Sequence, residues 1–400
     1  MYRFLYILFT RVAVHLLAIL GLFIPKFAQF QKARKTGNIV SVSNRKYWIH
    51  CASLGEYEMA IPLIDQLLKG HSLDDIIITF FSPSGYTQAA KGPYAKSIMY
   101  LPLDRLKFAQ QFLNNYAPQK AIFIRYDFWY NFIHEGQKRG VQFYLVNGRF
   151  QRDHFIFNWV GKPYLRLLKE FEQVFTSDTT SNSLLDNYAI NSTHTGDTRY
   201  DRVADISKEA IQYKEIESFK GERRLLVLGS SWEQEEELVA YLQTHNLENL
   251  AILIAPHDLK RSVIIMEKFE KYSPKRYSDS SFSNKDQILI LDTIGMLSAM
   301  YRYADFALIG GGFKGALHNI LEPAVWGCHL SFGPKIGKFP EAGDFIDAGF
   351  AMKVTDRENW VEEVTILLHN TALLENVKTK ARSFTASQVG ATKIILDNIG

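Results

Sequence analysis

The chain has 400 residues, of which 47% are hydrophobic, 14% aromatic and 22% charged. This length suits two domains of ordinary size, and the composition is that of a globular protein, which excludes disordered and low-complexity classes. The two cysteines, Cys51 and Cys328, are too few for a disulfide framework or a cysteine-based zinc site, and they favour a reducing compartment.

The net charge of +4 is distributed unevenly along the chain. Eight basic residues and no acidic residue precede Glu56, so the first 55 residues carry +8 and the rest of the chain carries −4. A basic end on a mildly acidic body is typical of a protein that meets an anionic surface, either nucleic acid or a phospholipid leaflet.

An almost wholly apolar segment runs from Phe4 to Ile24, interrupted only by Thr10, Arg11 and His15. As a helix it would be about 31 Å long, enough to cross the hydrocarbon core of a bilayer. Arg11 counts against a spanning position, because a cation at the bilayer centre costs about 2.5–3.5 kcal/mol. We therefore expect a membrane anchor, spanning or interfacial, and no nucleic acid partner; a buried N-terminal hairpin is the alternative. The basic residues that follow place the body on the cytoplasmic side.

After residue 37, short apolar runs alternate with stretches of helical periodicity, a pattern typical of parallel sheets covered by helices. The strands predicted for the first half are 47–52, 76–81, 97–101, 120–125, 142–146 and 173–176. A charged stretch near 203–222 indicates a linker. The strands predicted after it are 225–229, 251–255, 287–291, 306–309, 330–332 and 351–354.

The predicted fold class is therefore α/β, with two tandem Rossmann-like, doubly wound domains and a ligand cleft at the carboxyl ends of their strands. We assign residues 1–36 to the anchor, 37–205 to the first domain, 206–221 to the linker and 222–385 to the second domain. Residues 386–400 are expected to form a helix that can pack back on the first domain.

Polar residues follow the predicted strands of the first domain, where ligands bind in open α/β sheets. Glu56 falls in the first turn of a helix, where backbone N–H groups stabilise a carboxylate, and Asp127 lies among aromatic rings that can stack on sugars. Taken singly, these residues also have ordinary structural explanations, such as helix capping or core packing. The full set is Ser53, Gly55, Glu56, Ser82, Ser84, Gly85, Asp127 and Arg149.

The strongest signal in the second domain is the glycine-rich segment 310–315, which lets backbone approach a phosphate just before a helix. Its spacing fits G-x-G-x-x-G, but it lies late in the domain and no acidic residue ends the next strand, so we discount a dinucleotide fold. The sequence holds no P-loop and no His-Glu-x-x-His, so neither metal nor cofactor is expected. The candidates here are Ser230, Ser231, His257, Gly310, Gly311, Gly312, Lys314, His318, Asn319 and Glu322.

Taken together and in order, these segments resemble the bacterial 3-deoxy-D-manno-octulosonic acid (Kdo) transferases specific for lipid A, which are GT-B glycosyltransferases. The family opens with an apolar anchor, its His-Ala-Ala-Ser-Val-Gly-Glu motif stands here as 50–56, and its Thr-Pro-Thr-Gly turn stands as 82–85. Further matches are 100–104, 196–201, 292–295 and 318–323. No single motif is decisive, but seven in the correct order make chance agreement improbable.

The resemblance implies transfer of Kdo from CMP-Kdo to a lipid A precursor with inversion, on inner-membrane phospholipid at the cytoplasmic face, without a metal. It implies that Glu56 is the general base and that Asp127 is the second catalytic acid. The residues expected to hold the donor phosphate or ribose are Ser230, Ser231, Gly310, Gly311, Gly312, Asn319 and Glu322, with His257, Lys314 and His318 beside them. The residues expected to bind the acceptor are Ser53, Gly55, Ser82, Ser84, Gly85 and Arg149.

Two motifs depart from the family pattern. The family's Glu-x-Glu becomes Arg125-Tyr126-Asp127, and its Pro-Arg-His-Pro becomes 255–258 without the arginine, so Lys314 or Lys335 must supply the cation. Two alternatives therefore stay open: a GT-B enzyme with another nucleotide-sugar donor, or a catalytically silent, membrane-docked nucleotide-binding protein.

Overall fold

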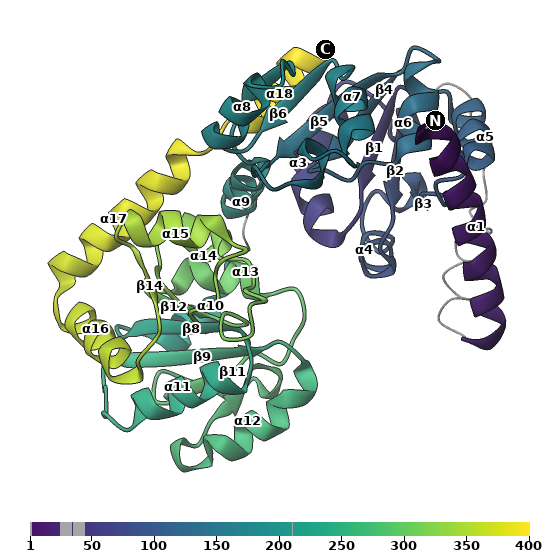
Figure 1. The fold of residues 1–400 in the computed structure, drawn as a ribbon. Coiled ribbons are helices and arrows are strands. Elements are labelled where there is room, and N and C mark those ends of the chain that lie inside the picture. Colours follow the sequence, from purple (N-terminus) through teal and green to yellow (C-terminus); the bar gives the residue numbers. More distant parts are fainter. Residues whose placement is uncertain (1, 25–33, 35–44, 210) are drawn as a thin grey trace. The chain divides into compact units, whose positions relative to one another are not determined.

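The computed structural model describes residues 2–24, 34, 45–209 and 211–400, and it divides into two compact units (Figure 1). Unit 1 comprises Met1–Arg202 and Gly390–Gly400, and unit 2 comprises Val203–Val389. Each unit is built on a seven-stranded sheet whose strand pairs are all parallel. The prediction of an α/β protein with two Rossmann-like domains is therefore confirmed.

The sheet of unit 1 has the strand order β3-β2-β1-β4-β5-β6-β7. The strands are β1 (Tyr47–Cys51), β2 (Ile76–Phe80), β3 (Ile98–Tyr100), β4 (Lys120–Ile124), β5 (Gln142–Gly148), β6 (Gln173–Thr176) and β7 (Ser192–His194). The direction in which strands are added reverses between β1 and β4. The carboxyl ends of these two strands form the topological switch point, where open α/β sheets bind ligands.

Helices cover both faces of this sheet. Alternate residues of β1 enter different cores: Ile49 packs in one cluster with Ile64 and Ile395, and Trp48 packs in the other with Phe112 and Phe132. The C-terminal helix thus completes the first cluster. The helices of unit 1 are α1 (Tyr2–Phe23), α3 (Leu54–Leu67), α4 (Pro83–Ala89), α5 (Leu106–Tyr116), α6 (Tyr130–Gln137), α7 (Lys162–Lys169), α8 (Thr179–Asp186), the start of α9 (Thr198–Glu209) and α18 (Ala391–Ile399).

The sheet of unit 2 has the order β10-β11-β9-β8-β12-β13-β14, with the reversal between β8 and β12. Its strands are β8 (Arg224–Ser231), β9 (Leu250–Pro256), β10 (Lys275–Arg276), β11 (Ile288–Ile290), β12 (Phe306–Ile309), β13 (His329–Phe332) and β14 (Ala351–Lys353). Its helices after α9 are α10 (Lys214–Lys220), α11 (Glu233–Gln243), α12 (Ser262–Lys268), α13 (Leu297–Met300), α14 (Leu321–Trp326), α15 (Pro340–Asp347), α16 (Arg357–His369) and α17 (Thr371–Ser387).

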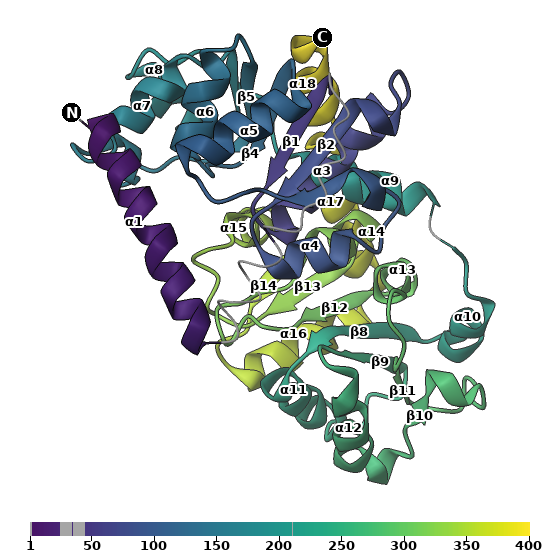
Figure 2. The same ribbon diagram turned by 90° about the vertical axis from the view of Figure 1, so that its right-hand side faces the viewer.

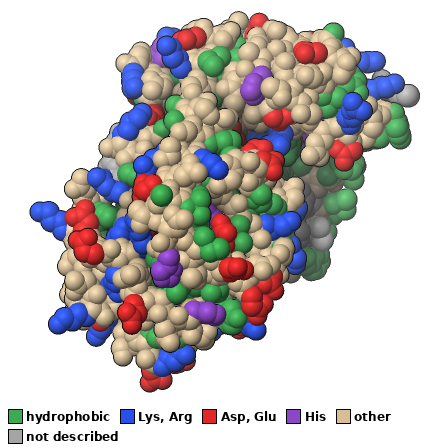
Figure 3. Space-filling model, turned by 90° about the vertical axis from the view of Figure 1, so that its left-hand side faces the viewer, with side chains coloured by type: hydrophobic (Ala, Val, Ile, Leu, Met, Phe, Trp, Pro, Cys, Tyr) green, Lys and Arg blue, Asp and Glu red, His purple; other side chains and the backbone are tan. Residues whose placement is uncertain are grey.

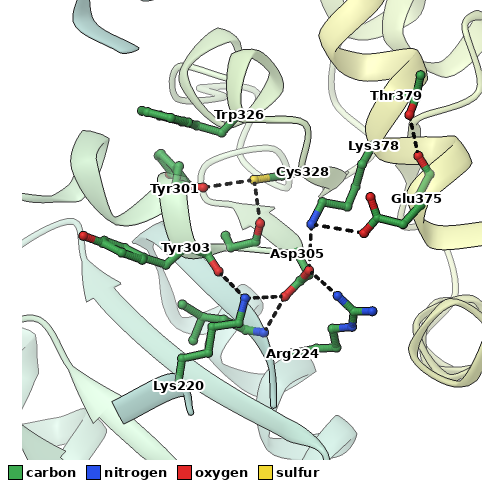
Figure 4. Close-up of polar contacts among 12 residues, drawn as sticks. Lys220, Arg224, Tyr301, Tyr303, Asp305, Trp326, Cys328, Glu375, Lys378 and Thr379 are labelled. Carbon is green, nitrogen blue, oxygen red and sulfur yellow. Dashed lines mark hydrogen bonds and ion pairs between the residues drawn. The ribbon is translucent and has the colours of Figure 1, made fainter. Parts of the chain in front are cut away.

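A buried carboxylate ties three segments of unit 2 together at the start of β12 (Figure 4). Asp305 is completely buried and pairs with Lys220 of α10 (3.0 Å), Arg224 of β8 (3.1 Å) and Lys378 of α17 (2.9 Å). Burial alone would raise the pKa of Asp305, but these cations outweigh it and hold the pKa below its ordinary value. We call this group the Asp305 cluster.

Helix α1 lies beside unit 1, and its carboxyl-terminal half projects from the unit in both ribbon views (Figures 1 and 2). Its first turns are attached by Tyr2 and Tyr6, whose rings pack against Tyr130 and Tyr164, and by a 2.6 Å hydrogen bond from Tyr6 to Asp104. Large apolar side chains farther along stay exposed: Phe4, Leu8, Phe9, Val12, Leu16, Ile19 and Phe23.

The structure does not support the predicted membrane anchor. Among the described residues, no helix is both long enough and apolar enough to span a membrane. Residues 25–33, 35 and 36 of the predicted anchor region lie outside the described residues. On the face of the molecule in Figure 3, acidic and basic side chains are interspersed.

Candidate active site

Glu56 stands at the switch point of unit 1, in the first turn of α3 directly after β1. Its Oε2 accepts hydrogen bonds from the backbone N–H groups of Ser53, at 3.3 Å, and of Ala52. Ser53 is the N-cap residue of α3, so the helix start itself fixes the carboxylate. The side chain is half-buried.

The surroundings of Glu56 make it a stronger base than an exposed glutamate. Burial and the negative charge of Asp127 raise its pKa, while His50 and the two backbone donors lower it by less. The pKa of Glu56 therefore lies above its ordinary value. A carboxylate tuned in this direction is suited to accept a proton from a hydroxyl near neutral pH.

Asp127 reaches the same edge from the neighbouring strand β4. The chain turns sharply after that strand at Arg125, a non-glycine residue with φ of 67°. The Oδ2 atom of Asp127 lies 2.8 Å from Nε2 of His50 and 2.7 Å from Nε1 of Trp129. The structure thus brings together the two predicted catalytic carboxylates, on adjacent strands of one sheet.

The predicted acceptor-binding residues of unit 1 fall into two groups. Gly55 has open space around it, and Ser82 and Ser84 hydrogen-bond to each other at the start of α4 (2.7 Å). By contrast, a Cβ on Gly85 would lie 2.9 Å from the backbone nitrogen of Leu54, so this glycine lets α4 approach α3. Arg149, after β5, pairs with Asp178 at 3.7 Å.

In unit 2 the glycine-rich loop follows β12 at the second switch point. Its backbone is closely packed: the N–H of Gly310 donates to Gly229 and that of Gly311 donates to the buried carboxylate of Glu235, both at 2.9 Å. Two of the N–H groups expected to hold a phosphate are thus already occupied. The prediction of phosphate binding rests on Gly312 and on the nearby side chains.

Those side chains form a stack beside the loop. The ring of His257 lies 4.3 Å from that of Trp232 and 4.8 Å from that of His318, and the Lys314 ammonium sits over Trp232 at 4.0 Å. Burial and His257 lower the pKa of His318. Trp232 and His257 also line a cavity of about 910 Å³ with residues 258–261 and 293–295. Aromatic faces, imidazoles and a cation suit a nucleotide or another anion.

The remaining donor candidates are divided between the surface and the interior. Asn319 and Glu322 hydrogen-bond to each other (3.0 Å) at the start of α14. Ser230 adopts a φ of 53° at the end of β8. Ser231 is completely buried, and its hydroxyl donates a hydrogen bond to Glu236. Two nitrogens of Arg261 also donate to this carboxylate. This burial indicates a structural role for Ser231 rather than the predicted contact with the donor.

Comparison with known proteins agrees with this geometry. Residues 26–202 match the family model for 3-deoxy-D-manno-octulosonic-acid transferase (kdotransferase). The 3-deoxy-D-manno-octulosonic acid transferase of Rickettsia felis is 26% identical over 82% of this chain and 72% of its own length. That of Chlamydophila psittaci is 27% identical over 80% and 77%. The chain is thus similar to Kdo transferases, which are glycosyltransferases, over most of its length.

The fold is shared with a solved structure of a different enzyme. The UDP-GlcNAc 2-epimerase of Neisseria meningitidis, solved with UDP-GlcNAc, superposes with a TM-score of 0.60 over 88% of this chain and 99% of its own, at 13% identity. This likeness concerns the fold alone, which is of the GT-B type.

Several residues that shape the site were not predicted to have a role. His50 and Thr79 are polar residues within otherwise apolar strands, and that contrast is a signal that could have found them. Glu235, Glu236 and Arg261 carry no comparable signal, because their partners are distant in the sequence.

Proposed function

We propose that the protein transfers Kdo from CMP-Kdo to a lipid A precursor, with Glu56 as the general base. The observation that carries the proposal is the position of Glu56 at the switch point of unit 1, with a pKa raised by burial and by Asp127, in a chain whose relatives are Kdo transferases.

The reaction is a single displacement in which Glu56 acts on the acceptor. Its carboxylate takes the proton of an acceptor hydroxyl as that oxygen bonds to the anomeric carbon of Kdo. The bond from this carbon to the phosphate oxygen breaks on the opposite face, so the configuration inverts and CMP leaves. In unit 2, Lys314 can offset the charge on the leaving phosphate, His318 can donate a hydrogen bond to it, and Asn319 with Glu322 suits the ribose hydroxyls.

The test is a mass measurement on a tetraacylated lipid A precursor. The precursor is incubated in detergent with the protein and separately prepared CMP-Kdo, from which divalent metal has been removed. We expect a gain of one or more Kdo masses. Glu56→Gln should lower the rate by about 10²–10⁴-fold and leave binding of CMP intact. An unchanged precursor, with the donor shown to be intact, would refute the proposal, and turnover by the Gln variant would refute the role of Glu56.

The same assay identifies the nucleotide of the donor. CMP should inhibit transfer and UDP should not, because a CMP-sugar site is expected to bind the cytidine product. Inhibition by UDP alone would favour a GT-B enzyme with another donor. Binding of CMP without product from any donor would favour the silent nucleotide-binding protein.

We further propose that α1 rests in the interface of the inner membrane at its cytoplasmic face. The exposed apolar side chains of α1 and the positive charge of the first 55 residues support this location. The protein should float with vesicles that contain anionic phospholipid. Phe9→Ser with Leu16→Ser should weaken flotation, whereas Ile394→Ser, an exposed apolar residue on α18, should not. Equal flotation of all three proteins would refute an α1 contact.

A further inference from the structure

A chain of hydrogen bonds runs through unit 1 from the core to Asp127. The indole nitrogen of Trp48 lies 2.8 Å from the hydroxyl oxygen of Thr79, which lies 2.8 Å from Nδ1 of His50. On the other side of the same imidazole, Nε2 lies 2.8 Å from Oδ2 of Asp127. Trp48, His50 and Thr79 are all completely buried, and strand register pairs His50 with Thr79.

The indole N–H groups of Trp48 and Trp129, at the two ends of this chain, decide which nitrogen of His50 carries the proton. An indole N–H can only donate, so Trp48 donates to Thr79. The buried hydroxyl proton of Thr79 then needs an acceptor, and Nδ1 of His50 is the one within reach. Since Nδ1 accepts, the imidazole proton is on Nε2 and is donated to Asp127. The indole nitrogen of Trp129 lies 2.7 Å from the same Oδ2 and 2.9 Å from Nε2 of His50. Because Nε2 already carries its proton, the indole N–H donates to Oδ2 and is its second donor.

We propose that His50 is a positioning residue for the transfer reaction. It holds Asp127 as a carboxylate, with Oδ2 fixed by two hydrogen-bond donors and Oδ1 left to contact the acceptor substrate. This inference rests on the proposed function of Glu56. His50 touches neither substrate in this scheme and acts through Asp127.

The charged groups around Glu56 determine the pKa of this general base. The titratable groups that face Glu56 are Asp127 from the β4 side and His50 and Cys51 from β1. Cys51 is buried, and burial raises its thiol pKa well above the ordinary value, so it stays neutral. His50 lowers the pKa of Glu56, and Asp127 is the anion that raises it. Losing that anion lowers the pKa of Glu56 toward its ordinary value.

The test compares His50→Leu, which removes both nitrogens, with His50→Gln, whose amide can still donate to Asp127. We expect His50→Leu to lower kcat roughly 10- to 100-fold, the range for a lost hydrogen bond to a charged group. The acid limb of the pH profile should move as well, because both His50 and the Asp127 that it positions act on the pKa of Glu56. His50→Gln should restore part of the rate and part of the native pH profile. Inhibition by CMP should not change in either variant.

Thr79 supplies a matched pair for the inner part of the chain. Thr79→Val keeps the shape but removes the hydroxyl, and should move the acid limb in the same direction. Thr79→Ser keeps the hydroxyl and should behave like the native protein. Thermal melts establish that each variant is folded. Separately, ¹⁵N-histidine NMR should show one Nε2–H tautomer that disappears in His50→Gln.

Three results would overturn the inference. The first is an equal loss of rate in His50→Leu and His50→Gln, with the acid limb of both pH profiles unchanged. A purely structural role for His50 predicts this result. The second is an Nδ1–H tautomer for His50. The third is that the native protein transfers no Kdo. This result differs from the other two, because it refutes the proposed function together with the role of His50.

Discussion

Gly55 and Gly85 were both predicted to face the acceptor, but their surroundings differ. A Cβ on Gly85 would crowd the backbone at the start of α3, whereas Gly55 meets nothing within 4 Å. Gly85→Ala should therefore lower the free energy of unfolding by about 1–3 kcal/mol. Gly55→Ala should be neutral or more stable by up to about 1 kcal/mol, because alanine favours the helix. Urea unfolding checks both, and equal effects would contradict this assignment.

At the level of residues, the sequence was sufficient to place Glu56 and Asp127 at one edge of a sheet. Strand ends are visible in the hydrophobic pattern, and parallel strands bring their carboxyl ends together. The pattern could not show that Glu235 occupies the N–H of Gly311, or that Arg261 pairs with the buried Glu236. Such pairings join segments far apart in the sequence, and periodicity describes only the surroundings of its own segment.

Among the elements, α10, β8 and α17 depend on the Asp305 cluster. Asp305→Asn removes the anion that three cations share, of which only Lys378 has another carboxylate partner among the described residues, Glu375 at 3.7 Å, and should destabilise unit 2 by about 3–5 kcal/mol. Hydrogen exchange of these three segments should rise. Lys378→Gln should have a smaller effect in the same direction, and Lys380→Gln, exposed on the same helix, should have none.

The pH dependence of this effect has a definite sign. The folded pKa of Asp305 lies below the ordinary value of 3.8, so its ionised form stabilises the fold above that pH. This stability is lost as the pH falls through the folded pKa. The native protein and Asp305→Asn should therefore converge in stability below about pH 4. A gap that stays constant down to pH 2 would contradict the ion-pair explanation.

Most strands were predictable because their apolar runs are long and buried on both faces. Strands β7 (Ser192–His194) and β10 (Lys275–Arg276) were not predicted. Both are short, polar and at sheet edges, so they bury too little to leave a pattern. Helix α1 differs from these strands because its apolar composition indicated a membrane anchor, spanning or interfacial. Composition alone does not show which side chains a helix leaves exposed.

For the whole molecule, the decisive feature is that unit 1 contains both ends of the chain. Ile395 of α18 is completely buried in a core cluster of unit 1, while its neighbour Ile394 is exposed. Ile395→Ala should lower the stability of unit 1 by about 2–5 kcal/mol, and Ile394→Ala should change it by less than about 0.5 kcal/mol. Limited proteolysis should show faster cleavage within unit 1 only for Ile395→Ala. Faster cleavage within unit 2 would contradict the assignment of α18.

The return of the chain to unit 1 also sets the order of events during synthesis. Residues 203–389 leave the ribosome as one uninterrupted segment and can complete unit 2 while translation continues. The described strands of unit 1 are all present by residue 194, but the sheet lacks the side chains of Ala391, Ile395 and Ile399 until those residues have been translated. One apolar face of the sheet therefore stays incompletely covered while unit 2 is made. Unit 1, which carries Glu56, begins to fold first and is completed only after unit 2.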